Sequence, residues 1–104
     1  MFTLDDLAET ISRRSAASAD QSYTRSLIDK GAAYCARKFG EEAVEFVIAA
    51  AAEDEWAVRA EAADALYHLL VVLQARGVAL AEVMSELESR TGQSGHDEKA
   101  ARKG

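Results

Sequence analysis

The spacing of apolar residues along this chain predicts four helices. Apolar side chains recur at intervals of three and four residues, which is the pattern of a helix with one buried face. The predicted helices cover residues 4–16, 32–52, 55–76 and 80–90. Residues 22–30 are too polar for a core strand and too few for a full helix, so we expect a loop there with no more than one helical turn.

Capping signals mark the ends of these predicted helices. Thr3 and Asp6 have the spacing of a capping box at the start of the first helix. Gly77 and Gly92 follow the third and fourth helices, where a glycine commonly ends a helix. Residues 93–104 are polar, and we expect them to form a tail after a single domain of residues 1–92.

One stretch of the third predicted helix is apolar on every side. Every residue from Leu66 to Leu73 except His68 is apolar. A helix that is apolar all round has to be covered all round. Four helices, two of them short, do not easily supply that cover, so we expect a homodimer in which the second and third helices pack against those of a second copy.

The composition supports an all-α fold. The 104 residues include no proline and six glycines, and they are rich in alanine, leucine, valine and glutamate. Proline is the strongest helix breaker and alanine the best helix former. We therefore expect an all-α protein, a bundle of about four helices in one domain.

Charge, cysteine content and hydropathy narrow the setting in which the chain works. The formal net charge of −6 argues against binding to a nucleic-acid backbone. The single cysteine, Cys35, allows no internal disulfide and no thiol pair for zinc, which suits a reducing cytosol. No signal peptide is recognisable, and no apolar run approaches the roughly 20 residues that span a membrane. We therefore expect a cytoplasmic protein with no nucleic-acid or membrane partner.

Acidic residues gather on the second and third predicted helices. Glu41, Glu42 and Glu45 lie close together on one helix, and Glu61 and Asp64 lie on the next. Residues three or four apart share a helix face, so antiparallel packing would bring four carboxylates into one small volume. Crowded carboxylates have raised pKa values unless a cation neutralises them. Oxygen ligands favour Mg²⁺ or Mn²⁺ over zinc, and bound Mg²⁺ usually keeps positions open for substrate phosphates. The pattern therefore indicates phosphoanhydride chemistry.

Two other readings of the acidic residues compete with this one. Glutamates often form a solvated helix face, although like charges four residues apart, such as Glu41 and Glu45, cost a few tenths of a kcal/mol. A di-iron bundle would show Glu-x-x-His pairs, which this chain lacks at these positions. His68 lies four residues after Asp64, and two roles stay open for it: orienting that ligand or contacting substrate, or forming a hydrogen bond at the edge of the core.

Four short motifs follow one another along the chain. They are Ser22-Tyr23-Thr24-Arg25-Ser26-Leu27, Lys38-x-Gly40-Glu41-Glu42-Ala43-x-Glu45, Glu61-x-Ala63-Asp64-x-x-Tyr67-His68-x-Leu70 and Ser94-Gly95-x-x-Glu98-Lys99-Ala100. The carboxylates of the second and third motifs resemble the Glu-Glu-x-x-Glu and Glu-x-x-Asp pattern of the MazG-type all-α nucleotide pyrophosphohydrolases. All four motifs together resemble the phosphoribosyl-ATP pyrophosphatase family of histidine biosynthesis, over nearly the whole chain.

This resemblance implies a MazG-like fold and a Mg²⁺-dependent hydrolysis of phosphoribosyl-ATP to phosphoribosyl-AMP and pyrophosphate, the second step of histidine biosynthesis. Glu41 would be an outer metal ligand or the proton acceptor for the attacking water, and Lys38 would neutralise phosphate charge. The implied Mg²⁺ ligands, with Mn²⁺ as a substitute ion, are Glu42, Glu45, Glu61 and Asp64. The implied substrate contacts are Tyr23, Thr24, Arg25, Lys30, Lys38, His68, Lys99 and Arg102.

Two other functions stay open at this point. One is a house-cleaning pyrophosphohydrolase that acts on non-standard or deoxynucleoside triphosphates at the same metal site. The other is a dimeric helical interaction module whose acidic face binds a basic partner. Only the enzymes require Mg²⁺ and bind phosphate analogues.

Overall fold

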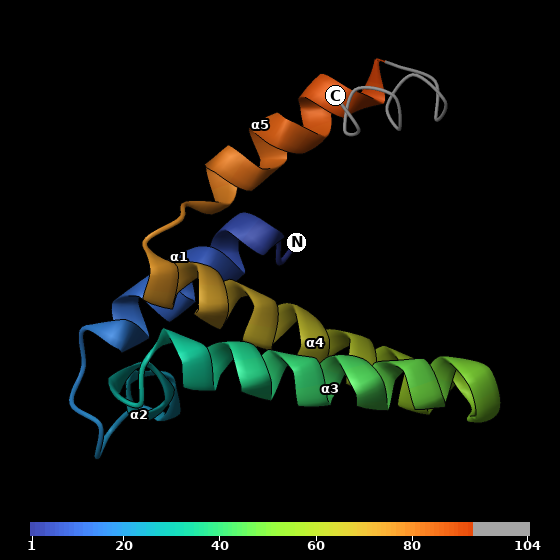
Figure 1. Ribbon diagram of the computed structural model, residues 1–104, viewed down its shortest axis with the longest axis horizontal. Helices are drawn as coiled ribbons and strands as arrows, with labels where there is room; N and C mark the ends of the chain where they lie inside the picture. The colour runs from blue at the N-terminus through green and yellow to red at the C-terminus, as the bar shows by residue number, and fades with distance from the viewer. Residues whose placement is uncertain (93–104) are drawn as a thin grey trace.

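In the computed structural model, which describes residues 1–92, the chain folds into five α-helices with no strand among the described residues (Figure 1). The helices are α1 (Leu4–Ser15), α2 (Tyr23–Asp29), α3 (Ala32–Ala52), α4 (Glu55–Arg76) and α5 (Leu80–Thr91). The predicted all-α fold is confirmed. The bounds of α3 and α4 match their prediction, and those of α1 and α5 differ from it by one residue at the C-terminal end.

The helix α2 corrects the prediction of a loop between the first two long helices. Ser22 caps its N-terminus, because the Ser22 hydroxyl accepts a hydrogen bond of 3.1 Å from the backbone N–H of Arg25. Arg25 and Asp29, four residues apart, form an ion pair of 2.7 Å along the helix. Leu27 is 2% exposed and anchors α2 in the core. Tertiary burial therefore stabilises a helix that is too short to be stable alone.

The capping signals appear in the structure as predicted. The Thr3 hydroxyl accepts a hydrogen bond of 3.1 Å from the N–H of Asp6, and the Asp6 carboxylate accepts one of 2.9 Å from the N–H of Thr3. Gly77 ends α4 in the left-handed conformation with φ of 71°, which favours glycine because it has no Cβ atom. These local signals explain why the ends of the long helices could be predicted.

An antiparallel hairpin of α3 and α4 forms the centre of the fold (Figure 1). These two helices make the most extensive contact between helices of the described chain. At one end of the hairpin, α1 lies along α4 and α2 crosses the start of α3. The helix α5 extends away from this body, and none of its residues is buried.

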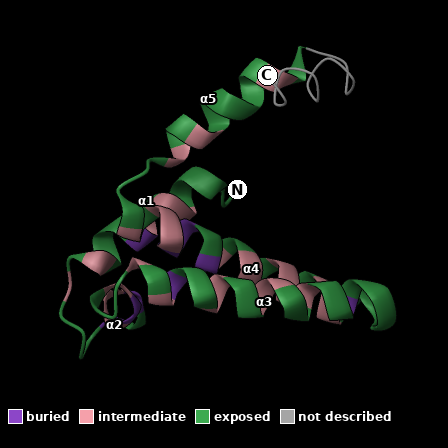
Figure 2. Ribbon diagram, in the orientation of Figure 1, coloured by how far each residue is buried: buried purple, intermediate pink, exposed green. Residues whose placement is uncertain are grey.

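The core lies at the end of the hairpin where four helices meet. Figure 2 shows buried residues clustered where α1 and α2 approach α3 and α4. Its buried side chains come from α1, α2, α3 and α4 and are Ile11, Leu27, Cys35, Leu70 and Val71. The opposite end of the hairpin is largely exposed, because α3 and α4 pack against each other there and no other described helix covers them.

No single helix among residues 1–92 is long and apolar enough to cross a membrane. Only together do α4 and α5 have the length and apolar composition of a membrane span, and the two helices are bent by 111° at the break between them.

Truncating the α2 anchor tests the role assigned to this short helix. We expect Leu27→Ala to lower the free energy of unfolding by about 2–5 kcal/mol, because it leaves a cavity in a core with four contributing helices. The matched change Leu87→Ala, at a side chain that is 48% exposed on α5, should alter it by no more than about 0.5 kcal/mol. Urea denaturation followed by circular dichroism measures both. Equal effects would show that α2 is not anchored in the core.

Candidate metal and substrate site

Three of the four predicted metal ligands meet between α3 and α4. Glu42 and Glu45 come from neighbouring positions on one face of α3, and Glu61 comes from α4. Each offers one carboxylate oxygen, and these three oxygens lie within 4.8 Å of one another. The antiparallel packing of the two helices therefore creates the acidic cluster that helical spacing predicted, made of these three residues.

The charged form of Glu61 is destabilised by its surroundings. Its Oε2 atom is buried and has no hydrogen-bond partner within the described chain. Burial raises the pKa of Glu61, and the charges of Glu45, Asp64 and Glu42 raise it further. A buried carboxylate oxygen that faces other carboxylates needs a proton or a cation as its partner. The oxygen donors of this cluster fit a hard divalent cation such as Mg²⁺.

The other two predicted acidic residues lie at the edge of this cluster. Asp64 is exposed and stands outside the group of three, although it is close enough to raise the pKa of Glu61. Glu41 is exposed as well, and its carboxylate lies 4.0 Å from the Arg37 guanidinium and 3.8 Å from the Lys38 ammonium. Both residues therefore border the cluster, Asp64 beside Glu61 and Glu41 through the Lys38 that it shares with Glu42.

Lys38 brings a positive charge to the cluster from α3. Its ammonium lies 3.7 Å from Glu42 Oε1 and 3.8 Å from Glu41 Oε1. Burial by itself would lower the pKa of Lys38, but the neighbouring Tyr23, Glu41 and Glu42 outweigh it, so the net shift is upward. Lys38 is therefore a charged group held beside the carboxylates, in the ordinary geometry of a helix ion pair.

His68 lies one turn beyond Asp64 on α4 and is buried, with 6% of its surface exposed. Its ring meets the edge of the neighbouring Tyr67 ring at 5.0 Å between centroids. Burial lowers the pKa of His68, in spite of an opposite effect from Glu42 and Asp64. Of the two roles left open by the sequence, this burial favours a neutral histidine at the edge of the core, beside the cluster.

Thr24 and Tyr67 join α2 to α4 next to this histidine. Their hydroxyl oxygens are 2.6 Å apart, which is a short hydrogen bond between residues 43 positions apart in the sequence. Thr24 is 1% exposed, so its hydroxyl faces Tyr67 and not solvent. The Tyr23 ring is exposed and lies parallel to the Tyr67 ring at 6.5 Å between centroids. Tyr67 was not among the residues predicted for the site, although it belongs to the same sequence motif as Asp64.

Two further predicted substrate contacts, Arg25 and Lys30, lie in different local environments. Arg25 binds its own chain, because its guanidinium donates hydrogen bonds to Asp29 at 2.7 Å and to the carbonyl oxygen of Ser15 at 3.0 Å. The Lys30 ammonium lies 4.7 Å from the centre of the Tyr34 ring. The structure therefore brings Lys38 to the acidic cluster and places Arg25 against the loop before α2. The predicted contacts Lys99 and Arg102 lie outside the described residues.

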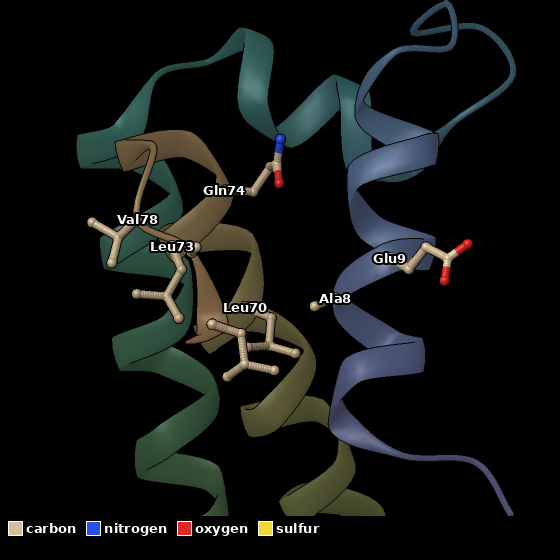
Figure 3. A pocket seen from close by; sticks show the side chains of 8 residues that line it. Ala8, Glu9, Leu70, Leu73, Gln74 and Val78 are labelled. Atoms are coloured by element: carbon tan, nitrogen blue, oxygen red, sulfur yellow. The ribbon is translucent and has the colours of Figure 1, made fainter. Parts of the chain in front are cut away.

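A separate small pocket lies between α1 and the C-terminal half of α4 (Figure 3). Its walls are mainly apolar, and Leu70 and Leu73 point into it, whereas the Glu9 carboxylate points away. The acidic cluster lies on the N-terminal half of α4, so this pocket is not part of it.

Adding a divalent cation should stabilise the fold. We expect Mg²⁺ or Mn²⁺ to raise the melting temperature of the wild type, because the ion binds the folded cluster and not the unfolded chain. Glu61→Gln should remove most of this increase, and it should raise the melting temperature of the metal-free protein because it removes a buried charge. Differential scanning calorimetry measures both, with Glu88→Gln on α5 as the control. A wild-type response to Mg²⁺ in Glu61→Gln would exclude this site.

Comparisons with known proteins identify the family of this chain. The sequence model of the family described as Phosphoribosyl-ATP pyrophosphohydrolase matches residues 4–91. The chain is 60% identical to Phosphoribosyl-ATP pyrophosphatase 1 of Bradyrhizobium diazoefficiens, over 98% of this chain and 96% of that protein. It is 57% identical to Phosphoribosyl-ATP pyrophosphatase of Azorhizobium caulinodans, over 96% and 92% of the two chains. It is 56% identical to the protein of that name from Methylobacterium nodulans, over 98% and 95%. The chain belongs to the phosphoribosyl-ATP pyrophosphohydrolase family.

Proposed function

We propose that this chain hydrolyses the α–β phosphoanhydride of phosphoribosyl-ATP and releases phosphoribosyl-AMP and pyrophosphate, the second step of histidine biosynthesis. The observation that carries the proposal is the cluster of three carboxylate oxygens within 4.8 Å, one of whose residues has a buried oxygen without a partner. This cluster offers the oxygen ligands that a divalent cation prefers, and such a cation in turn binds the phosphate oxygens of a substrate. The names of the close relatives supply the substrate.

Mg²⁺ is the proposed cofactor, with Mn²⁺ as a substitute. Glu42, Glu45 and Glu61 hold the ion, and Asp64 completes the set of ligands from the next turn of α4. When bound, the ion polarises a phosphoryl oxygen and neutralises its charge. The three central carboxylates come from two long helices that pack along their length, so they are held in place before substrate arrives.

The residues around the cation have separate proposed roles. Glu41 accepts the proton of the attacking water, because its carboxylate is exposed and lies beside Lys38, which also lies next to Glu42 of the cluster. Lys38 holds a positive charge next to Glu42 and stabilises the negative charge that develops on the leaving pyrophosphate. His68 is buried, with Lys38 and Glu42 close enough to influence its charge, and we propose that it positions α4 beside the cluster.

The proposed substrate contacts divide into direct and indirect ones. Tyr23 and Lys30 are exposed on α2 and at its end, so they contact ribose or phosphate directly. Thr24 and Arg25 position α2, because their polar groups bind Tyr67, Ser15 and Asp29 of the same chain.

Removing a metal ligand tests the activity. We expect Glu42→Ala and Asp64→Ala to lower the rate of pyrophosphate release from phosphoribosyl-ATP by more than about a hundredfold, since even residues behind a metal ligand contribute 10- to 100-fold. The helical circular dichroism signal should stay the same. A chelator should abolish the wild-type rate, and Mg²⁺ should restore it.

Parallel assays with ATP and dUTP separate this function from its alternatives. Faster pyrophosphate release from ATP or dUTP than from phosphoribosyl-ATP would indicate a house-cleaning pyrophosphohydrolase that uses the same acidic cluster. Wild-type turnover by Glu42→Ala would contradict the metal site. Release from none of the substrates would favour an interaction module.

We also propose that the chain forms a homodimer through α3 and α4. The outer surface of the hairpin carries large exposed apolar side chains, which are Val44, Val47, Ile48, Leu66 and Leu69. A neighbouring groove has almost purely apolar walls, formed by residues such as Phe39, Phe46 and Leu66. Contiguous apolar surface of this kind marks an interaction site, and a second copy of the same surface is the simplest cover for it.

A mass measurement tests the dimer. We expect light scattering at micromolar concentration to give twice the chain mass of 11.2 kDa. Leu66→Glu should give a mass of one chain, because it adds a charge to the apolar surface that the two copies share. A single-chain mass for the wild type would exclude the dimer, and a double mass for Leu66→Glu would exclude this face.

A further inference from the structure

Two cations share one aromatic ring at the start of α3. The Lys30 ammonium lies 4.7 Å from the centre of the Tyr34 ring, and the Arg37 guanidinium lies 5.2 Å from it. Contacts of this kind attract a cation to the face of the ring. A lysine from the end of α2 and an arginine from α3 therefore both lie against the same ring.

This basic patch, made of Lys30, Tyr34 and Arg37, leads toward the acidic cluster. Tyr34, Lys38 and Glu42 follow one another at intervals of four residues along α3, so they share one side of the helix. Eight residues separate Tyr34 from Glu42, which is about 12 Å along a helix axis. The patch and the cluster are thus two neighbouring sites of opposite charge, with Lys38 between them.

The substrate named for the relatives has phosphate in two places. Phosphoribosyl-ATP carries the triphosphate of ATP and, on its phosphoribosyl group, a single phosphate. A site with one acidic cluster and its cation accounts for the triphosphate only. The single phosphate needs a second group of donors, some distance from the first.

We infer that Lys30 and Arg37, held on the Tyr34 ring, bind the single phosphate of the phosphoribosyl group and so distinguish phosphoribosyl-ATP from plain nucleoside triphosphates. This inference rests on the proposed function. Arginine offers a planar fork of donors that matches phosphate oxygens, and lysine adds a point charge. Arg37 is available for this role, because its side chain is 70% exposed and its pairing with Glu41 is long, at 4.0 Å. Lys30 is exposed too.

The test compares two nucleotides that differ only in the phosphoribosyl group. Isothermal titration calorimetry with Mg²⁺ measures the binding of phosphoribosyl-AMP and of AMP to the full chain. We expect the wild type to bind phosphoribosyl-AMP at least about tenfold more tightly. The double variant Lys30→Gln/Arg37→Gln should lose this preference while its affinity for AMP stays within about twofold. Its KM for phosphoribosyl-ATP should rise by about tenfold with kcat little changed, because the lost contact is the same in ground and transition states.

The control variant Arg13→Gln/Arg76→Gln removes two positive charges from exposed positions on α1 and at the end of α4. It should keep the preference for phosphoribosyl-AMP. Melting temperatures of both variants show whether the fold is intact, since Lys30 also ends α2.

Three results would overturn the inference. A preference that survives in Lys30→Gln/Arg37→Gln would place the phosphoribosyl group elsewhere. An equal loss of affinity for both nucleotides would mean that the two cations bind the phosphate which the nucleotides share. A wild type that does not discriminate would exclude such a subsite. Failure of the proposed function is a different result, namely that the wild type releases no pyrophosphate from phosphoribosyl-ATP.

Discussion

Mutual repulsion among Glu42, Glu45 and Glu61 is the constraint on which the site depends. The antiparallel packing of α3 and α4 holds one oxygen of each within 4.8 Å and buries the Oε2 atom of Glu61 without a partner. Carboxylates in water would move apart. Here the helix contact prevents that separation, so the unfavourable electrostatic energy is stored in the folded protein and can be relieved when a cation binds.

The hydrophobic core and the acidic cluster occupy different parts of the α3–α4 hairpin, and this separation keeps the fold stable. The core of Ile11, Leu27, Cys35, Leu70 and Val71 lies at one end, where α1 and α2 cover α3 and α4. The acidic cluster lies farther along the same two helices, where less of the chain covers them. The buried apolar side chains therefore supply the stability, and the crowded carboxylates do not interrupt the core.

The short helix α2 links the core to the region around the cluster. Leu27 fixes it in the core, while Thr24 binds Tyr67 on α4, next to His68. Its C-terminal residue Lys30 reaches the Tyr34 ring at the start of α3. Although its sequence is polar, α2 thus connects the aromatic and basic side chains beside the carboxylates. A few long-range contacts determine its position.

The sequence by itself determined the long helices and the identity of the central carboxylates. The repeat of apolar positions and the glycine that ends α4 are local signals, so they predicted the extent of these helices. The helical period placed Glu42 and Glu45 on one face. The sequence did not determine α2, because its stability comes from the burial of Leu27 and Thr24 against distant residues. Only the tertiary structure decided that Arg25 binds the carbonyl oxygen of Ser15 and that Thr24 binds Tyr67, since these contacts depend on how separate helices pack.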